Sequence, residues 1–389
     1  MTLLSVTLHV VAVLAVVGGI AYALIAIVAA HTLHAERGTA GPVPSSLPAM
    51  SLLKPLCGAE PGLEAHLESF FRQEYPTFEL LFAVRQPIDP AAAIVARVMA
   101  RYPGVEAHLV VTGEPLYANA KVYSLEHMVA QAKHPILVIT DSDTSVGPQY
   151  LQAMARSFGP EEIGAVTNLY RGVGGTDVWS QLEALGMSTE FMAGVIVAAR
   201  LEGMTFALGP SMAIRTACLQ AIGGFRSLAE YFADDFVLGR RVADTGRRVR
   251  LSTHVVKHHA TAIGAWASFQ HRLRWNRSAR FSRPLGYLGQ GVTYMVPWAL
   301  VSYVASPHTL HAALLLGALV VRAGLAWVVA VHLLEDPTVL RRLWLLPLQD
   351  GLSFAAWVGG LLGRDVLWRH ERYRLLKGGR CALLTARRP

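Results

Sequence analysis

Residues 135–143 read Pro-Ile-Leu-Val-Ile-Thr-Asp-Ser-Asp, and this segment indicates the fold more clearly than any other. An apolar run that stops at carboxylates is typical of a buried strand followed by a loop. Similar strand patterns cover residues 51–56, 79–84 and 107–111, and helical patterns cover 64–71, 91–100 and 124–132. Strands that alternate with helices predict an α/β domain with a mostly parallel sheet, whose ligands bind beyond the carboxyl ends of the strands.

The composition indicates a membrane protein. Hydrophobic residues make up 53% of the 389 residues and charged residues 16%, with a mean hydropathy of +0.37. Soluble proteins average about 45–50% and 25%. The net charge is +8. Beside membrane segments, such an excess favours anionic phospholipid head groups as partners, rather than nucleic acid. Neither G-x-G-x-x-G nor a P-loop pattern occurs, which disfavours a dinucleotide site and a P-loop NTPase.

The N-terminus is the clearest membrane segment. No Lys, Arg, Asp or Glu occurs before Glu36, and the apolar run is long enough to cross a hydrocarbon core of about 30 Å. We therefore interpret residues 1–35 as a transmembrane anchor. A cleaved signal peptide is the alternative, but the segment has no positive start and no A-x-A site. The flanking charges place the chain that follows in the cytoplasm.

The remaining organisation follows from composition. We expect a linker at 36–49, a cytoplasmic domain at 50–283, a membrane region at 284–363 and a basic cytoplasmic tail at 364–389. Apolar runs cover 285–305, 308–334 and 343–362. A cytoplasmic body and tail need an even number of spans between them. We expect the first run, which Pro297 interrupts, to be interfacial or re-entrant and the other two to span. The short run 191–199 is either a buried helix or an interfacial helix where a lipid enters.

Three groups of residues are candidates for chemistry. Asp141 and Asp143, at i and i+2 in a loop, can share one Mg²⁺ or Mn²⁺, although Asp also favours turns. Asp235, in the sequence Tyr-Phe-Ala-Asp-Asp-Phe at 231–236, can act as a general base, although adjacent carboxylates also favour helix starts. Arg274 and Trp275 offer a guanidinium for a diphosphate and a flat apolar wall, although a basic segment of this kind also binds lipid head groups.

Several segments together resemble a known family, the ceramide glucosyltransferases. The resemblance is carried by Ser-Leu-Leu-Lys-Pro-Leu-Cys-Gly-Ala-Glu-Pro at 51–61, Leu-Glu-Ser-Phe-Phe at 67–71, Tyr-Pro at 75–76, Asn-Ala-Lys at 119–121, Asp-Ser-Asp at 141–143, Ala-Asp-Asp-Phe at 233–236 and the Arg-Trp pair. It covers roughly residues 50–285. Segments 183–190 and 208–212 look closest to the bacterial hopanoid-biosynthesis-associated glycosyltransferases.

The resemblance implies a GT-A fold, a Rossmann-like nucleotide-diphospho-sugar transferase domain, with transmembrane helices at both ends. It also implies a UDP-sugar donor, inversion at the anomeric carbon and a lipid hydroxyl acceptor, at a bacterial inner membrane. Asp141 and Asp143 would hold the divalent cation and the donor diphosphate, and Asp235 would be the general base. Arg274 and Trp275 would close over the donor, and Lys121 would lie near the nucleotide.

Two positions depart from the family pattern. Gln86 stands where the family has its first Asp; its amide can still contact the nucleotide, and Asp89 could replace it only if the loop shifts. His271 stands at the first position of the [Q/R]-x-x-R-W pattern, where it would meet the donor. The leading prediction is transfer of N-acetylglucosamine to a hopanoid polyol. Glucosylceramide synthesis, a processive polysaccharide synthase and a non-catalytic scaffold of a lipid-synthesis complex are the alternatives.

Overall fold

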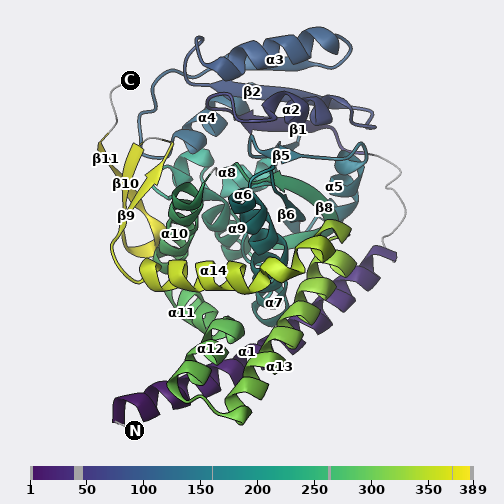
Figure 1. Ribbon diagram of the computed structural model, residues 1–389. Helices are drawn as coiled ribbons and strands as arrows, with labels where there is room; N and C mark the ends of the chain where they lie inside the picture. Colours follow the sequence, from purple (N-terminus) through teal and green to yellow (C-terminus); the bar gives the residue numbers. More distant parts are fainter. Residues whose placement is uncertain (1–2, 39–46, 160, 262–263, 370, 386–389) are drawn as a thin grey trace.

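The computed structural model describes residues 3–38, 47–159, 161–261, 264–369 and 371–385. Its centre is one eight-stranded sheet in the order β3-β2-β1-β4-β7-β6-β8-β5 (Figure 1). The strands are β1 (Met50–Pro55), β2 (Phe78–Val84), β3 (Ala107–Val111), β4 (Ile136–Ile139), β5 (Thr144–Ser145), β6 (Ile163–Val173), β7 (Met212–Arg215) and β8 (Arg248–His259). The first four are mutually parallel, as the sequence predicts, whereas β7 runs antiparallel to both β4 and β6.

Helices cover both faces of the sheet. They are α2 (Leu63–Phe71), α3 (Pro90–Arg101), α4 (Ala120–Val129), α5 (Tyr150–Phe158), α8 (Thr216–Ala221), the 3-10 turn η2 (Phe225–Leu228) and α9 (Asp234–Asp244). Sequence patterns alone explain the early ones: Asp89 and Asn119 cap α3 and α4 through their side chains. The strand β4 is entirely buried, which fixes the loop that follows it at the carboxyl edge of the sheet.

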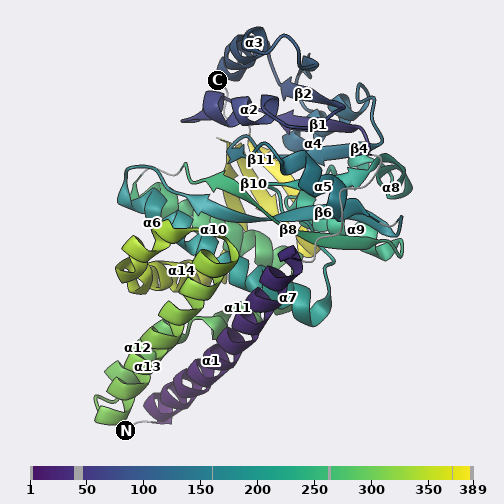
Figure 2. The same cartoon turned by 90° about the vertical axis from the view of Figure 1, so that its right-hand side faces the viewer.

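A second group of helices lies beside and below the sheet in Figures 1 and 2. It comprises α1 (Leu3–Gly38), α6 (Val178–Gly186), the π-helix η1 (Met187–Phe191), α7 (Met192–Glu202), α10 (Ala265–Ser282), α11 (Pro284–Thr293), α12 (Met295–Ala305), α13 (Thr309–Ala326), the π-helix η3 (Trp327–Leu333), the 3-10 helix η4 (Pro337–Leu345) and α14 (Leu346–Gly360). Three described helical segments are long and apolar enough to cross a membrane: Thr7–Arg37, Val178–Glu202 and Thr309–Leu333. The second is mostly buried inside the protein, which favours a buried helix for run 191–199.

The path of the chain through the apolar helices differs from the sequence prediction. Run 285–305 forms α11 and α12, and α12 passes back along α1, because Gly19 lies against Met295 and Ser302 approaches His9. The helix α13 then returns in the direction of α1: His311 stacks edge-on against His9, and η3 reaches the other end of α1. Runs 285–305 and 308–334 therefore form an antiparallel pair, whereas we expected runs 308–334 and 343–362 to form it.

The third run was predicted to span, and this prediction is wrong for the observed structure. Its main helix α14 has 15 residues, about 22 Å at 1.5 Å per residue, which is short of a core of about 30 Å. Figure 1 shows α14 lying across the direction of α1 and α13. Its buried polar face explains the difference: Asp350 pairs with Arg322 of α13, and Gln349 accepts from Arg272 of α10. Hydropathy averages over these residues and misses their partners.

The expected basic tail is folded. The described part of the tail forms an antiparallel sheet of β9 (Asp365–Trp368), β10 (Glu371–Leu375) and β11 (Cys381–Thr385), with a short 3-10 turn η5 (Lys377–Gly379). Val366, Tyr373, Leu375 and Cys381 bury a small core of their own against Phe232. This tail sheet stands beside α10 and the carboxyl edge of the main sheet (Figure 1).

Candidate active site

A buried lysine fixes the Asp-Ser-Asp loop through hydrogen bonds. Lys54 sits at the end of β1 with only 2% of its surface exposed. Its Nζ donates to the carbonyl of Asp141 at 2.6 Å and to Thr140 Oγ1 at 3.2 Å. Burial lowers the pKa of Lys54 to about 7, although Asp143, Asp141 and Glu60 oppose that shift. A charged residue within the apolar run 51–56 was the signal in the sequence, and we assigned it no role.

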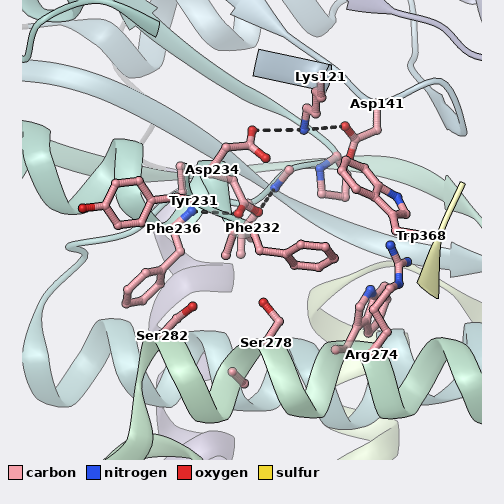
Figure 3. Close-up of a pocket in the computed structure, with 18 of the residues that line it drawn as sticks. Lys121, Asp141, Tyr231, Phe232, Asp234, Phe236, Arg274, Ser278, Ser282 and Trp368 are labelled. Carbon is pink, nitrogen blue, oxygen red and sulfur yellow. Dashed lines mark hydrogen bonds and ion pairs between the residues drawn. The ribbon is translucent and has the colours of Figure 1, made fainter. Parts of the chain in front are cut away.

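Lys121 joins the first two groups of carboxylates. From the first turn of α4 its Nζ reaches Asp141 Oδ1 at 2.8 Å and Asp234 Oδ2 at 3.5 Å (Figure 3). Burial disfavours the charged amine, but the carboxylates of Asp141, Asp234 and Asp235 outweigh it and raise the pKa of Lys121. The ammonium group therefore stays charged and holds the two loops together at the sheet edge.

Asp235 lies in the first turn of α9 and is fixed by two backbone amides. Gly209 N–H donates to its Oδ2 at 2.7 Å, and Phe236 N–H donates to its Oδ1 at 2.8 Å. Burial and the negative charge of Asp234 raise the pKa of Asp235 to about 6, while Lys121 opposes the shift. The N-cap of α9 is Ala233, so neither carboxylate serves as the N-cap. A carboxylate with a raised pKa near neutrality suits proton abstraction.

A candidate cation site lies around Asp143. His258, at the end of β8, places its Nε2 3.4 Å from Asp143 Oδ2. Among the described residues, Asp143 Oδ1 and His258 Nδ1 are buried without a hydrogen-bond partner. Although burial opposes the charged ring, Asp143 raises the pKa of His258. A carboxylate and a deprotonated imidazole are ligands that fit a divalent cation such as Mn²⁺. We assigned nothing to His258 from the sequence, because only the pairing of Thr144 with His258 across β5 and β8 brings it here.

The candidate residues of α10 face the same region. His271 Nδ1 lies 2.5 Å from Glu183 Oε1, and burial and Arg274 lower the pKa of His271, so the neutral ring donates to that carboxylate. Trp275 packs against His271 and Phe191. In the described part of the chain, the Arg274 guanidinium makes no hydrogen bond or ion pair, and Figure 3 shows it extending toward Trp368.

Gln86 lies at the rim, where its amide donates to Glu114 at 3.0 Å. Asp89 does not replace the missing acid. Its carboxylate caps α3 by accepting from Ala91 N–H at 2.9 Å, and it also accepts from Gly58 N–H at 3.0 Å. A group more compact than the Asp143 site, Glu79 with Glu106 and His108, lies at the opposite edge of the sheet, where Lys133 pairs with Glu106.

One cavity of about 2160 Å³ is lined by the site residues that the sequence predicted and by His258: Gln86, Lys121, Asp141, Asp143, Asp235, His258, His271, Arg274 and Trp275. Its upper wall carries Gln86, Lys121, Asp141 and Asp235. Its lower wall is formed by α7, α10 and α11, and two of these helices, α7 and α11, pack against α1. It is lined there by Val195, Ala198, Leu201, Ser278, Ser282, Leu285 and Thr293. A polar chamber at a sheet edge therefore opens continuously toward the apolar helices.

A mixed sheet of this order, with an Asp-Ser-Asp loop at its carboxyl edge, defines a GT-A glycosyltransferase. The chain belongs to Glycosyl transferase family 21, whose family model matches residues 10–381. Ceramide glucosyltransferase 1 of Caenorhabditis elegans is 26% identical over 231 residues, which cover 59% of this chain and 49% of that protein. Ceramide glucosyltransferase of Komagataella phaffii is 30% identical over 109 residues, covering 27% and 21%. The matched region thus spans about half or less of these relatives.

Among solved structures, the mannosyltransferase PcManGT from Pyrobaculum calidifontis, in complex with GDP-Man and Mn²⁺, is similar with a TM-score of 0.49 and 18% identity. The superposition covers 89% of this chain and 99% of that one.

Proposed function

We propose that this protein transfers a sugar, with inversion, from a UDP-sugar to the hydroxyl group of a membrane lipid. The observation that carries the proposal is the continuity of the cavity, which runs from the carboxylates to the apolar helices α7 and α11. A soluble acceptor needs no such opening. A lipid can keep its tail among the apolar side chains while its head group reaches Asp235.

Asp235 is the proposed general base. The acceptor oxygen attacks the anomeric carbon, its proton passes to the Asp235 carboxylate, and the bond from the anomeric carbon to the phosphate oxygen breaks with its electron pair leaving on UDP. The amides of Gly209 and Phe236 hold the carboxylate in place during this step. Inversion needs one base and no protein nucleophile.

The donor is proposed to lie between the Asp-Ser-Asp loop and α10. Asp143, His258 and Asp141 would hold a divalent cation, which neutralises charge on the departing diphosphate when bound. Arg274 donates to the diphosphate oxygens, since its guanidinium is unpaired in the described residues and lines the cavity. Lys121 keeps Asp141 and the loop of Asp234 at a fixed separation. Trp275 and His271 complete the wall beside the sugar.

The proposed acceptor is a hopanoid polyol and the proposed sugar N-acetylglucosamine, on the segments that resemble the hopanoid-associated enzymes. Ceramide and glucose are the second candidate, because the curated relatives are ceramide glucosyltransferases. We place the protein in a bacterial inner membrane as a multi-pass protein. The catalytic domain and tail sheet then share the cytoplasmic side, since α12 leaves that side and α13 returns to it.

The test uses full-length protein in lipid with Mn²⁺ or Mg²⁺. UDP-glucose and UDP-N-acetylglucosamine are each offered with a hopanoid polyol or ceramide, and the products are identified by mass. N-acetylhexosamine on the hopanoid supports the proposal, whereas glucose on ceramide keeps the mechanism and overturns the acceptor. No product from any pair, with the nucleotide still bound, indicates the scaffold.

The base is tested with Asp235→Asn and the matched control Asp244→Asn, at the exposed other end of α9. Loss of a general base lowers kcat by about 10²–10⁴-fold. We expect this loss in the Asp235 variant with donor binding nearly intact, and little change in the control. Near-normal turnover by Asp235→Asn would refute the assignment.

A further inference from the structure

The tail sheet β9–β11 contacts each of the three segments that carry the candidate site. Phe232 N–H donates to the carbonyl of Gly379 at 3.1 Å, and Cys381 N–H donates to that of Glu230 at 2.7 Å, so the tail is joined to the chain just before Asp235. Arg277 of α10 donates to the carbonyl of Asp365 at 2.6 Å. These bonds fix the tail sheet against the cavity rather than leaving it free to bind lipid.

Arg369, directly after β9, reaches the third segment. Its Nη2 pairs with Glu60 Oε1 at 2.7 Å and donates to Ser142 Oγ at 3.2 Å, inside the Asp-Ser-Asp loop. Its Nη1 donates to the carbonyl of Cys57 at 2.7 Å. Arg369 has a φ of 49°, a conformation that costs a non-glycine residue energy and that clusters at functional sites.

The guanidinium of Arg369 has N–H groups that no described residue accepts from. Its bonds within the described residues use Nη1 and Nη2 and leave Nε–H without a protein partner. Arg369 and Trp368 both line the cavity, as does Arg274 on the neighbouring helix α10, which packs against β9. Burial lowers the pKa of Arg274 to about 10; Glu183 opposes this shift, and the charge of Arg369 adds to it. The positive charges of Arg274 and Arg369 thus repel each other, and in the described residues no carboxylate is bonded to Arg274.

We propose that Arg369 is a donor-binding residue, and that it and Arg274 together hold the diphosphate of the nucleotide-sugar. The inference rests on the proposed nucleotide-diphosphate donor. Glu60 positions the guanidinium, whose remaining N–H groups donate to phosphate oxygens. The negative charge of a diphosphate offsets the repulsion between the two guanidinium groups. Arg suits this ligand because its planar fork matches phosphate geometry. The tail sheet is then a wall of the donor site.

The experiment compares UDP with uridine, which has no phosphate. Binding of each to full-length protein in lipid with Mn²⁺ is measured by calorimetry for the wild type, Arg369→Ala and Arg369→Lys. The control is Arg372→Ala, which removes an equal charge from an exposed position on β10. We expect Arg369→Ala to weaken UDP binding about tenfold and uridine binding less than twofold, in line with a charge-assisted hydrogen bond of about 1.5 kcal/mol. Arg369→Lys should fall between it and the wild type, and the control should match the wild type.

Two results would overturn the inference: unchanged UDP affinity in Arg369→Ala, or an equal loss for UDP and uridine, which would indicate a structural role. If the alanine variant does not fold, Arg369→Lys decides by the same ratio of UDP to uridine affinity. Failure of the wild-type protein to bind UDP would instead refute the proposed UDP-sugar donor, and this inference with it.

Discussion

The raised pKa of Asp235 makes the pH dependence of turnover a sharp test of the base. The base must be ionised to accept a proton, and Asp235 has a pKa of about 6. At pH 5 only about 9% of the carboxylate is ionised, and because the ionised fraction sets the rate, kcat/KM should fall about tenfold for each further pH unit. An Asp at its ordinary pKa of about 3.9 would keep full activity there.

The cause of the shift can be tested separately with Asp234→Asn. Burial raises the pKa of Asp235 most, and the neighbouring charge of Asp234 adds to it. Removing that charge should move the acidic limb down by about one unit, because a nearby like charge shifts a carboxyl pKa by this order. Asp244→Asn removes an equal charge at 61% exposure and should leave the limb in place.

The assay is kcat/KM for the donor between pH 4.5 and 8 at saturating acceptor, with release of UDP as the readout. Each variant is also checked for an unchanged melting temperature. A wild-type limb near pH 4, or a limb that does not move in Asp234→Asn, would refute the reasoning from burial and charge.

Three further predictions concern stability and metal. Arg322→Met leaves Asp350 buried without its partner between α13 and α14, and it should lower the free energy of unfolding by about 3–5 kcal/mol, measured by thermal unfolding in lipid. Equal stability would mean that the pair is not formed. Gly239→Ala puts a Cβ 2.4 Å from the backbone of Phe206 and should lower stability by about 1–3 kcal/mol, whereas Gly317→Ala, in open space, should not. EDTA should abolish transfer and Mn²⁺ restore it, and His258→Ala should raise the Mn²⁺ requirement about tenfold or more; an unchanged requirement excludes His258 as a ligand.

Local sequence patterns predicted the first four strands of the sheet with little error. The predicted strand 79–84 is β2 with one added residue, and 107–111 is β3 as predicted. Both strands are short apolar runs, β2 buried on both faces and the edge strand β3 partly exposed, so composition and length suffice. The orientation of β7 was not predictable, because an antiparallel strand within a parallel sheet has no sequence signal of its own.

The candidate site divides in the same way. Asp141, Asp143 and Asp235 could be proposed because each follows a strand or starts a helix, where side chains meet at the sheet edge. His258 and Arg369 could not, since each joins the site through partners far away in the sequence. Lys54 was visible as a charge within an apolar run, but its contact with the Asp-Ser-Asp loop has no local signal. The strand pairing β5–β8 places His258, and the fold of the tail places Arg369.

By itself, the sequence determined that this protein has an α/β domain with carboxylates at a strand end and apolar segments at both ends of the chain. Those features depend on residue type and spacing over a few turns or strands. Only the tertiary structure decided that run 343–362 forms a helix lying across the others, and that a basic tail forms a wall of the cavity. Both depend on charged side chains finding distant partners: Arg322 pairs with Asp350 in a buried position, and Arg369 pairs with Glu60 in a more exposed one. No local sequence pattern contains these contacts.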